Sequence, residues 1–170
     1  MQLNITTDYA VRAMLYLALV GRQASSSEIS EAMSIPENYL YSVMGKLKKA
    51  GYVKASRGVN GGWSLVKEPE ELTLLDMILV MEGTFKINSC LEDEANCSRG
   101  AVASCQIHDI YSEVQDYLES YFSSITLANL RDWQWTPIYE FTAEPRPDGV
   151  SPYRRDPGEG TVHPADLPEG

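Results

Sequence analysis

The chain has 170 residues, a formal net charge of −10 and three cysteines, a length that suits one compact domain or a small domain with appendages. No run of about eighteen apolar residues is present, so no membrane span is expected. The apolar run AMLYLALV lacks the positively charged segment that opens a signal peptide, so we expect a cytoplasmic protein, in which an odd number of cysteines argues against disulfides.

Three short helices are predicted in residues 1–50. The first can be capped by Thr6 or Thr7, and the second, SSEISEAM, has a serine at its start and a glutamate soon after, as in a capping box. The third, PENYLYSVMGKLKKA, begins at Pro36, a residue favoured in a first turn, and is ended by Gly51.

Two strands and two further helices are predicted next. YVKASR and WSLVK are strand-like, and Asn60-Gly61 between them is typical of a hairpin turn. LTLLDMILVME is typical of a helix, and LANLRDW adds a final turn. A long helix is predicted between them by apolar residues at positions 107, 110, 111, 114, 117, 118, 121, 122 and 125.

Charge is distributed unevenly along the chain. Residues 1–67 carry eight Lys and Arg against four Asp and Glu, whereas residues 68–170 carry six against twenty. Residues 38–67 hold six basic residues and no acid. Such a segregated balance indicates a nucleic-acid partner for the first part of the chain, despite the acidic total.

Three helices followed by a hairpin are the order of a winged helix-turn-helix. In the third helix, Leu40, Val43, Met44 and Leu47 share one face, while the opposite face can enter a major groove. We expect base or phosphate contacts from exposed polar residues of this helix and a minor-groove contact from the wing. The predicted DNA-binding residues are Asn38, Tyr41, Ser42, Lys46, Lys49 and Arg57.

The long helix is apolar along one side and needs a partner surface. A symmetric dimer would cover this side and would place two recognition helices about 34 Å apart, one turn of DNA. Packing on the helix's own winged domain is the alternative.

The segments TTDYAVRAMLYLA, ISEAMSIPENYL, LKKAGYVKASRGVNGGWSL and ITLANL resemble the IscR/NsrR-type family of bacterial winged-helix transcription regulators. The resemblance covers roughly residues 1–132. It implies a homodimer that binds a palindrome-like double-stranded DNA operator, and in many members an iron–sulfur cluster is the sensor.

All three cysteines lie in one short acidic segment with the spacing C-x6-C-x7-C-x2-H. The spacing lacks the tight cysteine pair that is usual in structural zinc sites, whereas iron–sulfur clusters tolerate wider gaps. The spacing therefore favours a cluster over zinc, and the resemblance implies that Cys90, Cys97 and Cys105 are cluster ligands.

The resemblance implies two candidates for the fourth ligand. His108 matches the histidine that family members with a 2Fe–2S cluster use, and Asp8 matches the aspartate that completes a 4Fe–4S cluster in nitric-oxide-sensing members. We favour Asp8 of the partner subunit and a 4Fe–4S cluster. Each residue also has a purely structural explanation, as a first-turn acid and as a polar residue at a helix end.

We therefore expect a mainly α fold with a small β wing, divided into five parts. These are a winged helix-turn-helix DNA-binding domain (1–67), a linker helix (68–89), a cysteine-containing cluster-binding loop (90–106), a dimerisation helix (107–132) and a disordered acidic tail rich in Pro and Gly (133–170).

The predicted function is a homodimeric DNA-binding transcription regulator, a repressor, that senses nitric oxide, redox state or iron status through an iron–sulfur cluster. One alternative is a cluster-free regulator that senses oxidants through its thiols. Another is a small metal-binding or electron-transfer protein that does not bind DNA. No set of residues typical of an enzyme is present.

Overall fold

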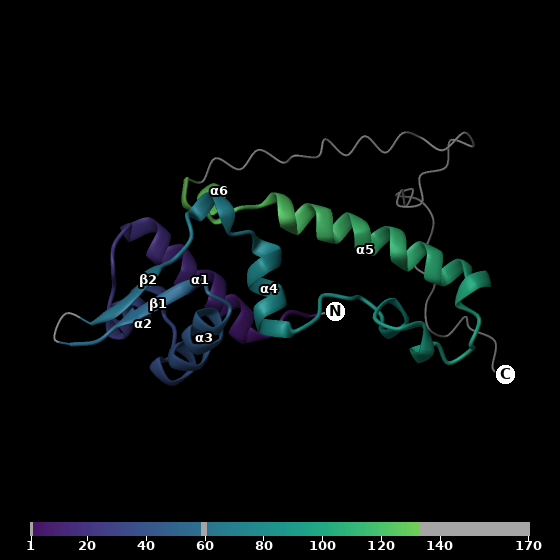
Figure 1. Cartoon of the computed structure of the whole chain (residues 1–170), viewed down its shortest axis with the longest axis horizontal. Helices are drawn as coiled ribbons and strands as arrows, with labels where there is room; N and C mark the ends of the chain where they lie inside the picture. Colours follow the sequence, from purple (N-terminus) through teal and green to yellow (C-terminus); the bar gives the residue numbers. More distant parts are fainter. Residues whose placement is uncertain (1, 59–60, 133–170) are drawn as a thin grey trace, which may run out of the picture. The chain divides into compact units, whose positions relative to one another are not determined.

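The computed structural model describes residues 2–58 and 61–132. Its helices and strands follow the chain in this order: α1 (Ile5–Val20), α2 (Ser26–Met33), α3 (Glu37–Lys49), β1 (Val53–Ser56), β2 (Gly62–Leu65), α4 (Leu74–Glu82), α5 (Gln106–Ser124) and α6 (Leu127–Asp132). Single 3-10 turns lie at Pro69–Glu71, Ser89–Leu91, Glu94–Asn96 and Val102–Ser104. The expected mainly α fold with a β wing is confirmed (Figure 1).

Helix α1 is the centre of the winged domain, because it packs against α2, α3, α4, α6 and β2. Its small and apolar side chains meet those of α3, α4 and α6 in one continuous core. The largest core residues that are fully or almost fully buried are Met14, Leu17, Ile29, Ile35, Leu40, Met44, Leu47, Leu72, Met77 and Leu127.

The start of α1 differs from the prediction. The cap is Asn4, whose side chain accepts a hydrogen bond from the Thr6 N–H at 3.0 Å, so the prediction of Thr6 or Thr7 as the cap is wrong. Thr7 is buried instead, and its hydroxyl donates to Glu82 at the end of α4. Asn and Thr side chains can both cap a helix, so the sequence alone does not tell which of them does so. Here Thr7 contacts Glu82, and Asn4 is left as the cap.

The wing is a two-stranded antiparallel sheet in which Val53 pairs with Leu65 and Ser56 with Gly62. Ala24, in the turn between α1 and α2, forms a β-bridge with Trp63 on the other edge of β2. The wing is therefore attached to the helical part by backbone hydrogen bonds of 2.8 and 3.0 Å. Asn60 lies outside the described residues.

Helix α4 joins the winged domain to α5, since it contacts α1 and α3 on one side and α5 on the other (Figure 1). Helix α5 matches the predicted long helix, except that Ile125 ends it and is buried within the chain. No helix in residues 2–58 and 61–132 is long and apolar enough to cross a bilayer. The predicted disordered tail, with His163, lies outside the described residues.

Candidate nucleic-acid interface and metal centre

Helix α3 has the two faces that its sequence predicts. Its buried residues are Leu40, Val43, Met44 and Leu47, which pack into the core of the winged domain. Asn38, Tyr41, Ser42 and Lys49 are exposed on the remaining surface. A helix held by one face while the other presents donors to solvent can enter a major groove.

The turn before α3 holds this helix at a fixed angle to α2. Ser34 adopts a left-handed conformation with φ of 52°, and Ile35 after it is buried. The Ser30 hydroxyl donates to the Ile35 carbonyl, and the Arg12 guanidinium donates to the Met33 carbonyl at 3.4 Å. The turn therefore connects α1, α2 and α3 and sets the position of the predicted recognition helix.

The wing places Arg57 directly after β1, exposed to solvent. Trp63 of β2 donates its indole N–H to the Ser26 hydroxyl at 3.0 Å, which fixes the wing against α2. Gly62 comes so close to Ala24 that a Cβ there would lie 2.3 Å from the Ala24 carbonyl oxygen. Arg57 thus follows β1 in a hairpin that is anchored at the end of its strands nearest the turn.

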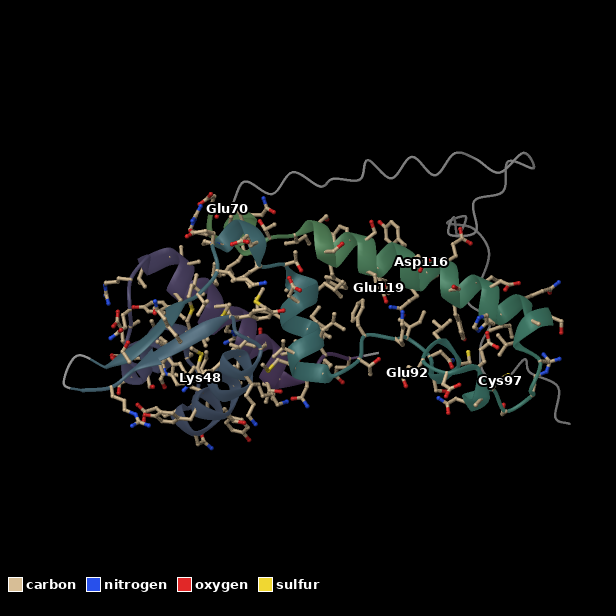
Figure 2. The ribbon with its side chains drawn as sticks, in the orientation of Figure 1. Lys48, Glu70, Glu92, Cys97, Asp116 and Glu119 are labelled. Carbon is tan, nitrogen blue, oxygen red and sulfur yellow. The ribbon has the colours of Figure 1, made fainter. Side chains whose placement is uncertain are left out.

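Lys46 differs from the other predicted DNA contacts. Its ammonium donates to the Met81 carbonyl at 3.1 Å, at the end of α4. Lys48, on the same helix (Figure 2), and Lys49 are both exposed, and neither makes a side-chain hydrogen bond or ion pair with the described residues. Lys46 is therefore the lysine of α3 that connects this helix to α4.

The cysteine segment runs from α4 to α5 through the last three 3-10 turns. The Asn88 side chain accepts the Cys90 N–H at 3.3 Å and shapes the first of these turns. Cys90, Cys97 and Cys105 are all half-buried free thiols. Among the described residues no three His, Cys, Asp or Glu side chains are arranged to hold a metal ion together. Metal sites often assemble only when the ion binds, so the ligand set stays a prediction.

The beginning of the cysteine segment is attached to α5. Gln115, which is 2% exposed, accepts the Ile87 N–H at 2.8 Å and donates to the Phe85 carbonyl at 3.1 Å. Lys86 forms a 2.7 Å ion pair with Glu119, which lies on the side of α5 that faces this segment (Figure 2). The path from α4 to Cys90 is therefore fixed at three successive residues.

Cys90 and His108 line the same pocket, which has a volume of about 220 Å³. Its other walls carry Glu92, Asp93 and the buried Gln115. The Nδ1 atom of His108 is buried and has no hydrogen-bond partner among the described residues. A buried ring nitrogen without a partner is costly, and a metal ion would satisfy it.

Cys97 lies toward the end of the segment that is away from α4 (Figure 2). The backbone N–H groups of Ala101 and Arg99 are the main cause that holds the pKa of this thiol below its ordinary value. The Gly100 N–H and the positive charge of Arg99 act in the same direction. The thiolate, which is the form that binds metals and reacts with oxidants, is therefore favoured at Cys97.

Asp8 is placed apart from the cysteines of its own chain. It lies in the first turn of α1 and forms an ion pair with Arg12 at 2.5 Å. It lines a separate pocket of about 280 Å³, with Leu3, Val11 and Ile78. Asp8 therefore lines a different pocket from the one that Cys90 and His108 share.

The apolar side of α5 is exposed. Ile107 and Ile110 are each 57% exposed, and Tyr111, Val114 and Tyr117 are exposed beside them. Gln115 is the buried residue of this helix, on the side that faces the cysteine segment. Packing on the chain's own winged domain, the alternative explanation of the stripe, therefore does not account for these five residues.

Sequence reasoning missed the residues that attach the cysteine segment, Gln115, Lys86 and Glu119, and also Glu82, which attaches the end of α4 to the start of α1. A lone glutamine beside an apolar stripe is a weak signal, because the same pattern occurs on exposed helix faces. The tertiary structure was needed to identify them.

Comparisons with known proteins agree with the fold and with a transcriptional regulator. The sequence model of the Rrf2 family, described as an iron-dependent transcriptional regulator, matches residues 3–132. A protein of Aquifex aeolicus (strain VF5), named as an HTH-type transcriptional regulator, is 34% identical over 126 residues, which cover 74% of this chain and 88% of the relative. A protein of Haemophilus influenzae with the same kind of name is 34% identical over 132 residues, covering 76% of this chain and 86% of the relative.

Two solved structures share the fold. CymR (YrzC), named as the global cysteine regulator of B. subtilis, superposes with a TM-score of 0.66 and 27% identity, over 79% of this chain and 99% of CymR. IscR of T. potens superposes with a TM-score of 0.59 and 27% identity, over 80% of this chain and 93% of IscR. The relatives are transcriptional regulators and not enzymes. They give no support to the alternative of a protein that does not bind DNA.

Proposed function

Since this chain belongs to the Rrf2 family of transcriptional regulators, we propose that it is a homodimeric repressor that senses its signal through an iron–sulfur cluster. The observation that carries the DNA-binding part is α3, which is buried on one face and exposes polar and basic residues on the other.

Asn38, Tyr41 and Ser42 lie on the exposed side of α3 and would read bases or contact phosphates in the major groove. Lys49 follows on the same helix and would contact a phosphate. Arg57, exposed after β1, would enter the neighbouring minor groove, where a narrow groove attracts a guanidinium.

The exposed stripe of α5, formed by Ile107, Ile110, Tyr111, Val114 and Tyr117, would form the seam of the dimer. Regulators of this family bind DNA and are typically dimeric. A two-fold axis at this seam makes the operator palindrome-like, because each subunit presents the same recognition helix to one half-site.

Cys90, Cys97 and Cys105 would hold the cluster. The family's description as iron-dependent supports this assignment, and so do the backbone N–H groups around Cys97, which hold the pKa of its thiol below the ordinary value. An iron–sulfur cluster supplies iron that reacts with nitric oxide or oxygen and that is lost when iron is scarce.

The fourth ligand decides the type of cluster. His108 shares a pocket with Cys90 and has a buried Nδ1 without a described partner, which supports a histidine ligand from the same chain. Asp8 would have to come from the partner subunit and exchange its ion pair with Arg12 for iron. The contacts within one chain support His108, and with it a 2Fe–2S cluster. Asp8 of the partner subunit is the second candidate ligand, since its buried Oδ2 makes no hydrogen bond to the described residues beyond the ion pair with Arg12.

A regulator that senses oxidants through its thiols is the second candidate. The half-buried Cys97, whose backbone surroundings favour the thiolate, supports it. Such a regulator would bind DNA without iron and would lose that binding reversibly on oxidation.

The experiment that separates these proposals is a visible absorption spectrum with iron and sulfide analysis, on protein purified without oxygen. We expect a coloured protein with about two iron atoms per subunit. The visible absorption of the cluster should be lost in the His108→Ala variant and kept in the Asp8→Ala variant. About four iron atoms and sensitivity to Asp8→Ala would instead favour the 4Fe–4S cluster. A colourless protein that still binds DNA would remove the cluster and leave the thiol sensor.

A further inference from the structure

Lys46 donates a hydrogen bond to the end of α4, whereas Lys48 and Lys49 on the same helix do not. The last carbonyl groups of a helix have no partner within that helix and carry the negative end of its dipole. The Met81 carbonyl is one of them, and it accepts the Lys46 ammonium at 3.1 Å. The carbonyl of Leu79 is satisfied separately by the Gly83 N–H at 3.0 Å.

The same end of α4 is attached to the start of α1. The Glu82 carboxylate accepts the Asn4 N–H at 2.8 Å and the hydroxyl of the buried Thr7. We call this set of Lys46, Met81, Glu82, Asn4 and Thr7 the α4 junction. It brings the recognition helix, the first helix and the helix that precedes the cysteines into direct contact.

The α4 junction is continuous with the cysteine segment. Gly83, with φ of 80°, ends α4, and the buried Phe85 then packs edge-to-face on Phe122 of α5 at 5.2 Å between ring centroids. The hydrogen bonds of Gln115 hold the next residues, up to the turn that contains Cys90. The segment between the end of α4 and Cys90 is therefore held by packing and hydrogen bonds and has little freedom to absorb a movement at Cys90.

We propose that Lys46 is a positioning residue that couples the recognition helix to the cysteine segment, rather than a phosphate contact. Its ammonium holds α3 against the end of α4, so a change in the cysteine segment changes how α3 is presented to DNA. Coupling of this kind acts in both directions, so DNA bound at α3 must also alter the cysteine segment. Which signal acts through this coupling depends on the proposed function, but the coupling between the cysteine segment and α3 does not require a cluster.

The chain offers a matched control. Lys49 lies one turn further along α3, is exposed as Lys46 is, and makes no side-chain contact of this kind with the described residues. Lys46→Met and Lys49→Met remove the same charge from the same helix, and methionine keeps the apolar length of the side chain. Both are compared with the wild type as iron-free, full-length protein, with a DNA duplex that the wild type selects from a random pool.

The first measurement is the dependence of DNA affinity on salt concentration. Each phosphate contact that is lost lowers the slope of log K against log salt by about 0.9. We expect this decrease for Lys49→Met and an unchanged slope for Lys46→Met. A slope that falls equally in both variants would make Lys46 a phosphate contact and overturn the proposal.

The second measurement is hydrogen exchange of the amides of residues 83–90 at saturating DNA. We expect DNA to slow this exchange about fivefold or more in the wild type and in Lys49→Met, because coupling between sites commonly reaches that size. In Lys46→Met the effect should be absent, although the DNA site is filled. Equal slowing in Lys46→Met, or none in the wild type, would overturn the proposal. Both measurements use iron-free protein, so the cluster assignment can fail while the coupling still stands.

Discussion

The side-chain oxygen of Gln115 accepts the backbone N–H of Ile87 at 2.8 Å, across 28 positions of the sequence. The same side chain donates to the Phe85 carbonyl and to the Glu119 carboxylate. One buried glutamine thus satisfies a backbone donor and a backbone acceptor in the stretch between α4 and Cys90. It makes α5 the support on which the cysteine segment begins.

Gln115→Leu should therefore destabilise the protein more than the loss of one exposed hydrogen bond would. The leucine fills the space but leaves the Ile87 N–H and the Phe85 carbonyl without their partner, which costs about 1–3 kcal/mol for a buried group. We expect a free energy of unfolding that is lower by about 2 kcal/mol in urea titrations. Glu113→Leu, an exposed change on the same helix, is the control, and an equal effect of both would contradict this role of Gln115.

Gly62→Ala should displace the wing. The new Cβ would lie 2.3 Å from the Ala24 carbonyl oxygen, and that carbonyl already accepts the Trp63 N–H at 2.8 Å. Such crowding costs about 1–3 kcal/mol. We expect a lower melting temperature together with weaker DNA binding, because Arg57 is carried by this hairpin.

Gly45→Ala is the matched substitution, and we expect it to raise the stability of the protein where Gly62→Ala lowers it. Apart from the nearby backbone of α3 itself, no described atom lies within 4 Å of a Cβ built at Gly45, which is in the interior of this helix. Alanine in a helix interior is favoured over glycine by about 0.5–1 kcal/mol. Thermal unfolding should show stabilisation for Gly45→Ala and destabilisation for Gly62→Ala. A Gly62→Ala variant as stable as the wild type would mean that the wing tolerates the crowding, and a destabilised Gly45→Ala variant would contradict the expected gain in α3.

The faces of α3 could be predicted from sequence because burial repeats with the period of a helix, and Leu40 and Met44 lie where that period places them. The spacing of Cys90, Cys97 and Cys105 favours a cluster site, and His108 could be nominated beside them because of the resemblance to a known family. Gln115 and Lys46 could not be interpreted in the same way. Their roles depend on which backbone groups of distant segments lack a partner, and no local pattern encodes that.

The α4 junction should make part of the free energy of unfolding depend on pH. The Thr7 hydroxyl is the main cause that lowers the pKa of Glu82, followed by the Asn4 N–H and the charge of Lys46. The folded protein therefore binds a proton at Glu82 less readily than the unfolded chain does. This contribution is complete above the ordinary carboxyl pKa and is lost as the pH falls through the lower, folded value.

Glu82→Gln should consequently lower the free energy of unfolding most near neutral pH and only a little in acid. We expect a loss of about 1 kcal/mol in the free energy of unfolding at neutral pH, which shrinks as the pH is lowered below the ordinary carboxyl pKa and through the folded value. The difference between variant and wild type is the quantity to measure, because Glu28 and Glu119 also have lowered pKa values and shape the wild-type curve. A difference that does not change with pH would show that Glu82 acts without its charge.

Ile110→Glu should separate the subunits without harming the single chain. Ile110 is 57% exposed in one chain, so the fold of that chain does not depend on its burial. At a dimer seam the same substitution places a carboxylate of each subunit in an apolar interface, where an unpaired charge is expensive.

We expect the dissociation constant of the dimer, measured by sedimentation, to rise at least about a hundredfold, equal to about 2.7 kcal/mol. Ser123→Glu adds the same charge at another exposed position of α5, away from the apolar stripe, and should leave the dimer intact. DNA binding should weaken in Ile110→Glu alone, because a palindrome-like site needs two linked recognition helices. A dimer that survives Ile110→Glu would move the seam away from the exposed stripe of α5, and the stripe would then need another partner.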